Sequence, residues 1–454
     1  MKKILAFIFL VTSFVQAQHT LKGTMTPALE SDWIILYKIE GARQKFIKNS
    51  KIKIDSVTVD GTKRTVGHFS FEFPENTKVG SYRVTYRTEE AGFVDFIFNK
   101  EDVSFAFHPD YPEQSVVFSK SEENIIYREY LSDISVAQQK LDSLQITALK
   151  NPDVDLKAAY VSGLQKINSI QQEYLKATEN KYVNPFIKAT LRANAKELQT
   201  TPKMYMSNMI NTFFNNMDFS DKTLLNSSFL VDRITDYVFY INYSENKETQ
   251  QKLYKNSIQT VLNKITDLPF KKDVIEFLIA QFENSKNLEL LDYLFESHYK
   301  KLPEGLQNKN FINEKMALFA TEIGRTAPDF SWIENGKNLT LSKLDEAKNY
   351  VLVFWSTDCS HCLKEIPQLY TFLQDKKDIK VVAFSLERND FGWNNMKTTL
   401  PNWHHVLGLN KWENKIARTY NIMATPTYFV LDANKKIIAK PEELKDVKEY
   451  LDKL

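Results

Sequence analysis

Apolar and polar residues alternate in short runs along the first quarter of the chain. In Phe69–Phe73 and Val103–Phe107, every second side chain is aromatic or aliphatic, which is the period of a strand that buries one face. Glycines fall between the runs, where turns form readily. We therefore expect a small antiparallel β-sandwich over residues 18–119, with strands near 33–37, 69–73, 82–86, 93–98 and 103–107.

The middle of the chain has the period of a helix. Apolar residues recur at intervals of three and four, as in the series Leu131, Ile134, Ala137, Leu141 and Leu144. Prolines that break or begin helices divide the region, namely Pro152, Pro185, Pro202 and Pro269. The pattern predicts a domain of several helices over residues 120–320, which could act as a spacer or as a docking domain.

A third pattern begins at about residue 321. Tyr350–Trp355 and Ile379–Phe384 are continuous apolar runs, as expected of strands that are buried on both faces. A helical pattern, Leu363–Gln374, lies between them. The sequence therefore predicts a mixed sheet covered by helices over residues 321–454, with further elements near 412–420, 427–431, 436–439 and 442–454.

The first 17 residues have the features of a secretory signal peptide. Two lysines precede the apolar run Ile4–Val11, and small residues follow at Val15–Ala17. The run is too short for a membrane anchor, which needs about 20 apolar residues, and no cysteine follows for lipid attachment. We expect a mature chain that starts at Gln18, is soluble without stable membrane insertion, and resides in an oxidising compartment, most simply a bacterial periplasm.

Composition limits the classes of partner. The chain of 454 residues is 43% hydrophobic and 13% aromatic, which is enough for several packed cores. Its formal charge is +2, and removal of Lys2 and Lys3 leaves 57 basic and 57 acidic residues. This balance does not indicate nucleic acid or an anionic membrane as a partner.

Both cysteines of the chain, Cys359 and Cys362, lie three residues apart. They follow a predicted buried strand and begin a predicted helix, whose free N–H groups and positive partial charge favour a thiolate. We therefore expect Cys359 to be the nucleophile and Cys362 to resolve the mixed disulfide. Two alternatives stay open. A structural disulfide would gain little from so small a loop, and a metal clip would need more ligands than the neighbouring His361.

The residues around the dithiol form a specific set. Phe354–Thr357 precede Cys-Ser-His-Cys, Pro367 lies in the following helix, and Ala424–Thr427 form a second short motif. Together with Gly324–Phe330, they resemble the TlpA-like thiol-disulfide oxidoreductases of the redoxin superfamily. The resemblance implies a thioredoxin-like fold for residues 321–454, with a redox-active disulfide in place of a bound cofactor or metal.

The same resemblance assigns roles to three residues near the dithiol. It implies that Pro426 follows a cis peptide bond, and that Thr425 and Pro426, with Trp355 as scaffold, position the substrate chain. The alternating N-terminal pattern is similar to the β module that often precedes thioredoxin-like domains in exported Bacteroidetes proteins.

The sequence departs from the family pattern at the dithiol. Asp358 replaces the usual tryptophan, and a carboxylate there should raise the pKa of Cys359. His361 acts the other way, since an imidazolium stabilises the thiolate and makes the disulfide a stronger oxidant. Val353 stands where thioredoxins carry a buried aspartate, so Glu387 is a candidate substitute as proton acceptor. We expect the pair His404–His405 to lie in a solvated loop.

These observations favour thiol-disulfide exchange with proteins of the cell envelope. Without a third cysteine, regeneration must come from an external redox partner. A peroxidase is disfavoured because Leu352 occupies the position of the peroxiredoxin proline. A more serious alternative is an envelope binding protein whose dithiol is structural or only senses redox state. The N-terminal and helical regions could select the partner or hold a homodimer together.

Overall fold

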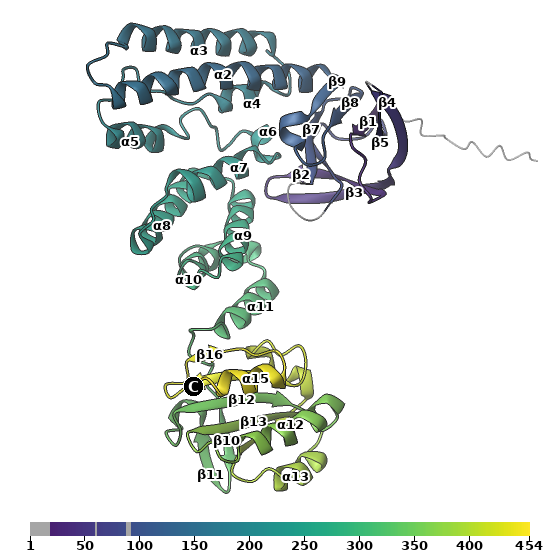
Figure 1. The fold of residues 1–454 in the computed structure, drawn as a ribbon, viewed down its shortest axis with the longest axis vertical. Helices are drawn as coiled ribbons and strands as arrows, with labels where there is room; N and C mark the ends of the chain where they lie inside the picture. Colours follow the sequence, from purple (N-terminus) through teal and green to yellow (C-terminus); the bar gives the residue numbers. More distant parts are fainter. Residues whose placement is uncertain (1–18, 60, 88–91) are drawn as a thin grey trace, which may run out of the picture. The chain divides into compact units, whose positions relative to one another are not determined.

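The computed structural model describes residues 19–59, 61–87 and 92–454. The predicted signal peptide, residues 1–17, lies outside this part of the chain. Contacts divide the chain into two compact units, Met1–Leu306 and Gln307–Leu454 (Figure 1). The predicted β and helical regions both fall in the first unit up to Leu306, while helix α11, Lys309–Ala320, belongs to the second unit.

Two sheets form the N-terminal sandwich. One has the strand order β4-β5-β1-β8-β9 and the other β3-β2-β6-β7. Their inward-facing residues, including Leu21, Phe71 and Phe96, form one apolar core. The pairings are antiparallel as predicted, except that β1 runs parallel to β8. The strands are β1 His19–Met25, β2 Trp33–Glu40, β3 Arg43–Lys51, β4 Lys53–Val59, β5 Thr62–Phe73, β6 Gly80–Thr85, β7 Phe93–Phe98, β8 Val103–Phe107 and β9 Val117–Lys120.

Helices make up the rest of the first unit, and the long helices α2 and α3 lie side by side (Figure 1). Pro185, Pro202 and Pro269 occupy the first turns of α4, α5 and α9, where a missing N–H leaves no hydrogen bond unmade. The predicted breaks there are confirmed. The helices are α1 Pro112–Ser115, α2 Glu122–Lys150, α3 Lys157–Ala177, α4 Asn184–Thr190, α5 Pro202–Thr212, α6 Lys222–Leu225, α7 Phe229–Thr235, α8 Lys247–Lys264, α9 Leu268–Asn284 and α10 Leu288–Ser297. A π-helical turn, Asp236–Ile241, follows α7, and two 3₁₀ turns, Tyr299–Lys301 and Glu304–Leu306, follow α10.

The second unit is built on a mixed five-stranded sheet of order β14-β13-β12-β15-β16. Strands β12, β13 and β14 are parallel, whereas β15 runs antiparallel to β12 and β16 to β15. The elements are β10 Ser331–Glu334, β11 Lys337–Thr340, a 3₁₀ turn Leu341–Lys343, β12 Asn349–Trp355, α12 Ser360–Leu373, β13 Ile379–Glu387, α13 Phe391–Thr398, β14 His404–Leu409, a 3₁₀ turn Lys411–Glu413, α14 Lys415–Thr419, β15 Thr427–Asp432, β16 Ile437–Ala439 and α15 Leu444–Leu451.

Strand β12 supplies both cores of this unit. Val351, Val353 and Trp355 pack into one core with residues of α12 and α15, whereas Leu352 and Phe354 face a second core on the other side of the sheet. The continuous apolar run therefore corresponds to a strand covered on both faces, as the sequence predicts. The mixed α/β architecture predicted for the C-terminal region is confirmed.

One local expectation is wrong. His404 and His405 do not lie in a solvated loop but begin strand β14, and His404 is only 9% exposed. The Nδ1 of His404 is 2.7 Å from Glu334 Oε2, and its Nε2 hydrogen-bonds Glu346. Carboxylate partners from distant parts of the chain allow a polar side chain such as His404 to be buried, and the local pattern does not reveal such partners.

None of the described helices combines the length and the hydropathy of a membrane span.

Candidate active site

The two cysteines lie where strand β12 passes into helix α12. Cys359 is the N-cap residue of α12, and its Sγ accepts a hydrogen bond from the backbone N–H of Cys362 at 3.2 Å. Both residues are free thiols, with Cys359 partly exposed and Cys362 fully buried. The carboxyl ends of parallel strands are the usual edge for sites in such sheets, so the fold presents one sulfur to solvent and keeps the other beneath it.

The surroundings of the two thiols shift their pKa values in opposite directions. Burial works against ionisation of Cys359, but hydrogen bonds from the Cys362 thiol, from the Thr425 side chain and from the N–H groups of Cys362 and His361 outweigh it and lower the pKa of Cys359. For Cys362, burial and the neighbouring Cys359 raise the pKa to about 12. Near neutral pH, Cys359 is therefore the sulfur more easily ionised, while Cys362 holds its proton.

The loop before β15 faces the nucleophile. The Cys359 thiol donates to the carbonyl oxygen of Thr425 at 3.2 Å, and the Thr425–Pro426 peptide bond is cis. A cleft of about 110 Å³ is lined by Ser356, Asp358, Cys359, Leu386, Lys411, Trp412 and Thr425. The structure therefore brings Thr425 together with Cys359 in one open cleft, and Pro426 follows Thr425 directly.

His361 and Trp355 differ in their exposure to solvent. His361 is exposed in the first turn of α12, and its N–H helps stabilise the Cys359 thiolate. Trp355 is fully buried in the core that also contains Cys362. It therefore lies beneath the site as part of this core, and its predicted role as scaffold for the substrate-positioning residues stays a prediction.

Glu387 lies at the end of β13 and is 3% exposed. Its Oε1 accepts from the Thr357 N–H and the Ser385 hydroxyl, each at 2.6 Å, and its Oε2 accepts from the Thr357 hydroxyl at 2.9 Å. These bonds occupy most of the acceptor positions of a carboxylate. Glu387 is therefore placed to hold the loop that leads into Cys359. Its three hydrogen bonds go to Thr357 and Ser385 and not to a cysteine, so its role as proton acceptor stays a prediction.

An ion pair lies beside the nucleophile. Lys411 Nζ is 2.6 Å from Asp358 Oδ2, and this hydrogen bond, with the charge of Lys411, lowers the pKa of Asp358. The sequence reveals Asp358 as a departure from the family pattern but does not reveal Lys411. Residues 53 positions apart form the pair, so local sequence signals could not have found it.

A second pair that sequence reasoning missed lies in the core near the sulfurs. The Tyr428 hydroxyl donates to Glu365 Oε2 at 2.8 Å, and Tyr428 packs in the same core as Cys362. Burial, Glu365 and both cysteines raise the pKa of Tyr428. Glu365 follows Cys362 by three residues in one helix, so the spacing that puts both on one face was an available signal.

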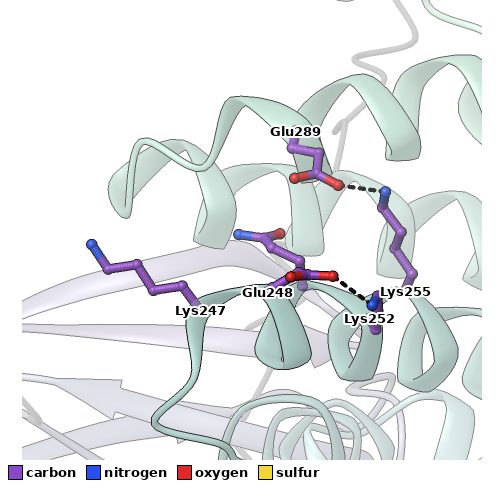
Figure 2. Close-up of a pocket in the computed structure, with 6 residues that line it drawn as sticks. Lys247, Glu248, Lys252, Lys255 and Glu289 are labelled. Carbon is purple, nitrogen blue, oxygen red and sulfur yellow. Dashed lines mark hydrogen bonds and ion pairs between the residues drawn. The ribbon is translucent and has the colours of Figure 1, made fainter.

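The described residues contain another cleft, in the first unit. A cavity of about 360 Å³ between α8 and α10 is lined by Lys247, Glu248, Gln251, Lys252, Lys255 and Glu289. Figure 2 shows that the carboxylates of Glu248 and Glu289 point toward Lys252 and Lys255, at 2.7 and 2.6 Å. The cleft contains no thiol, and these ion pairs neutralise most of its lysines.

Among residues 19–59, 61–87 and 92–454, no group of three or more His, Cys, Asp and Glu side chains is placed to hold a metal ion.

Comparison with known proteins identifies the second unit. The family model described as Redoxin matches residues 322–454. The thiol-disulfide oxidoreductase ResA of Bacillus thuringiensis subsp. konkukian (strain 97-27) is 30% identical over 140 residues, which cover 29% of this chain and 79% of ResA. ResA of Geobacillus thermodenitrificans (strain NG80-2) is 27% identical over 157 residues, covering 32% and 83%.

Among solved structures, a domain of a possible thiol-disulfide isomerase from Cytophaga hutchinsonii ATCC 33406 matches with 32% identity and a TM-score of 0.26. The match covers 29% of this chain and 92% of that domain. The Redoxin match lies within the second unit, which carries the partly exposed Cys359 and the buried Cys362. This chain belongs to the TlpA-like thioredoxin-fold family of thiol-disulfide oxidoreductases.

Proposed function

We propose that this protein is exported and exchanges disulfides with proteins of the cell envelope through Cys359 and Cys362. The single observation that carries the proposal is the asymmetry of the dithiol. Cys359 is partly exposed at the N-cap of α12 with a lowered pKa, while Cys362 is buried with its pKa raised to about 12. A partner can reach the sulfur of Cys359, and the buried Cys362 reacts only in the second step, when it attacks the mixed disulfide.

The reaction follows from this asymmetry. The Cys359 thiolate attacks a partner disulfide, forms a mixed disulfide and releases one partner thiolate. Cys362 then loses its proton and attacks Cys359 Sγ, which releases the second partner thiol and leaves a Cys359–Cys362 disulfide. The partner gains two electrons and two protons, and the reverse sequence oxidises a partner dithiol. Thr425 lines the groove where the partner chain would lie, and Pro426 follows it across the cis peptide bond. An external thiol or redox protein restores the starting state.

Export and the identity of the partners rest on the sequence. The lysines, apolar run and small residues of positions 1–17 support passage to a periplasm, where protein disulfides are common substrates. The N-terminal sandwich and the helices of the first unit would select partners or hold a homodimer together. The electron direction depends on the reduction potential of the couple. A potential near about −270 mV would make the protein a reductant, and one near about −120 mV an oxidant.

The test is disulfide turnover by the full mature chain. Reduction of insulin with a small thiol as electron donor is compared for the wild type, Cys359→Ser and Cys362→Ser, with Ser360→Ala as the matched control. We expect Cys359→Ser to lose at least about 100-fold in rate. Cys362→Ser should accumulate a mixed disulfide with insulin, visible by non-reducing electrophoresis, and Ser360→Ala should retain the wild-type rate.

Retention of turnover by Cys359→Ser would rule out this mechanism. Equal rates for all variants, close to that of the small thiol alone, would instead favour the binding protein in which the dithiol is structural or only senses redox state.

A further inference from the structure

The wall of the active-site groove carries an unusual charge pair. Asp358, directly before the nucleophile, is 60% exposed, whereas the Lys411 side chain that binds it is 21% exposed and lines the same groove. The lysine is thus partly enclosed beside a carboxylate that could otherwise remain solvated. A surface ion pair without such placement would contribute little to stability, so the position of this pair calls for a different explanation.

The backbone around Lys411 is held in a costly conformation. Asn410 and Lys411 both adopt the left-handed region, with φ of 71° and 46°, although neither is glycine. The side-chain amide of Asn414 donates to the Leu409 carbonyl at 2.9 Å and braces this turn. Successive left-handed residues without glycine are uncommon and concentrate at functional sites. The turn aims Lys411 and the following Trp412 into the groove that contains Cys359.

The other titratable and charged groups around the dithiol are His361, Cys362, Glu365, Glu387, Arg388 and Tyr428. Glu387 is bonded to Thr357, and Glu365 accepts from Tyr428. The charge of Arg388 also favours the ionised form of Asp358, but less than Lys411 does. The hydrogen bond to Asp358 comes from Lys411, which makes this lysine the main counterion of the carboxylate next to the nucleophile.

We propose that Lys411 is a positioning residue that neutralises Asp358 beside the nucleophile and so sets how readily Cys359 reacts, an inference that rests on the proposed function. A bare carboxylate one residue from a thiol opposes formation of the thiolate, because like charges repel. Lys411 cancels this effect without touching the sulfur itself. The pair therefore lets the chain carry an aspartate before the nucleophile and still keep a reactive thiol.

The test is a double-mutant cycle on the full mature chain in its reduced form. The rate of Cys359 alkylation by iodoacetamide is measured from about pH 5 to about pH 10, where Cys362 keeps its proton, and the reduction potential of the couple is measured by glutathione equilibration. The proteins are wild type, Lys411→Met, Asp358→Asn and the double variant. Lys415→Met, at an exposed position of α14, is the matched control, and Lys411→Arg tests rescue by charge.

We expect Lys411→Met to lower the alkylation rate near neutral pH by about two- to fivefold, as one unit charge near the sulfur would do. It should also make the potential more negative, because the thiolate form is less stable. Asp358→Asn alone should leave both quantities close to wild type, because Lys411 already cancels the charge of Asp358. The double variant should return close to wild type, as should Lys411→Arg, while Lys415→Met should change neither.

Two results would overturn the inference. One is a Lys411→Met protein whose alkylation profile and potential match the wild type, since a purely structural lysine would change only thermal stability. The other is an equal effect of Lys411→Met with or without Asp358, since the lysine would then not act through the carboxylate. Both readouts follow the thiol itself and not turnover, so they remain distinct from a failure of the proposed envelope function.

Discussion

Cys359 and Cys362 lie three positions apart, and this single turn of helix gives them different chemistry. Cys359 caps the helix, and the N–H of Cys362, which has no partner within the helix, donates to its sulfur. Cys362 lies one turn further in, among the apolar side chains of β12, α12 and α15. The same helix start therefore stabilises charge on one sulfur and excludes charge from the other, which is the order of reactivity that disulfide exchange requires.

This difference predicts selective alkylation. In the reduced protein at pH near 7, iodoacetamide should modify Cys359 and leave Cys362 unmodified, because the pKa of Cys359 is lowered and that of Cys362 is raised to about 12. The rate at Cys359 should rise with pH, with a midpoint below that of an ordinary thiol. Peptide mass spectrometry across a pH series measures both sites. Equal modification of both cysteines at neutral pH would contradict the assignment.

Glu387 supports a second prediction at this scale. Replacing it with Gln leaves an amide group facing donors of Thr357 or Ser385, so at least one buried hydrogen bond is lost. We expect Glu387→Gln to reduce the free energy of unfolding by about 1–3 kcal/mol. The alkylation midpoint of Cys359 should move little, since Glu387 acts on the loop. Glu442→Gln, at an exposed position, is the control, and a large shift of the midpoint in Glu387→Gln would instead support a proton acceptor.

At the scale of elements, hydrophobic period predicted most of what the structure contains. The runs at 350–355 and 379–384 correspond to β12 and β13, because strands buried on both faces need apolar side chains throughout. The hairpin β10–β11 and strand β14 were not predicted. His404 is buried through bonds to Glu334 and Glu346, which lie 70 and 58 residues away. Local periodicity carries no information about such partners, nor about the Asp358–Lys411 pair.

Close packing between α13 and the dithiol loop gives a prediction for these elements. A Cβ at Gly392, in the first turn of α13, would lie 2.6 Å from Thr357 Oγ1, whose position is fixed by Glu387. We expect Gly392→Ala to displace the loop, to lower the free energy of unfolding by about 1–3 kcal/mol and to slow Cys359 alkylation. Thermal unfolding and alkylation rates measure the two effects.

Gly305→Ala is the matched control for this change, because nothing lies within 4 Å of a Cβ there. If both alanine variants behave like the wild type, the contact between α13 and Thr357 does not hold the loop.

At the scale of the whole molecule, each unit has its own apolar cores. The sandwich core draws on residues up to Val116 and the partly buried Phe118, whereas the two cores of the second unit draw on residues from Ala327 onward. The two cores of the second unit therefore share no residue with the sandwich core. The sequence pattern changes at about residue 321, but the contacts divide the chain at Leu306 and Gln307, because helix α11 continues the helical period of the preceding region.

The assignment of α11 to the second unit predicts how two fragments differ. A fragment of residues 307–454 keeps α11, which packs near α14 and buries Phe319 to 4% exposure. A fragment of residues 321–454 removes that helix. We expect both to fold and to reduce insulin, since the dithiol and both cores are intact, but the longer one should be more stable by about 1–3 kcal/mol because it keeps the buried aromatic ring.

Urea unfolding of the two fragments measures this difference, and Phe319→Ala in the longer fragment should remove most of it. Equal stability of the fragments would mean that α11 does not pack on the second unit in solution. The boundary would then lie where the hydrophobic pattern changes, near residue 321.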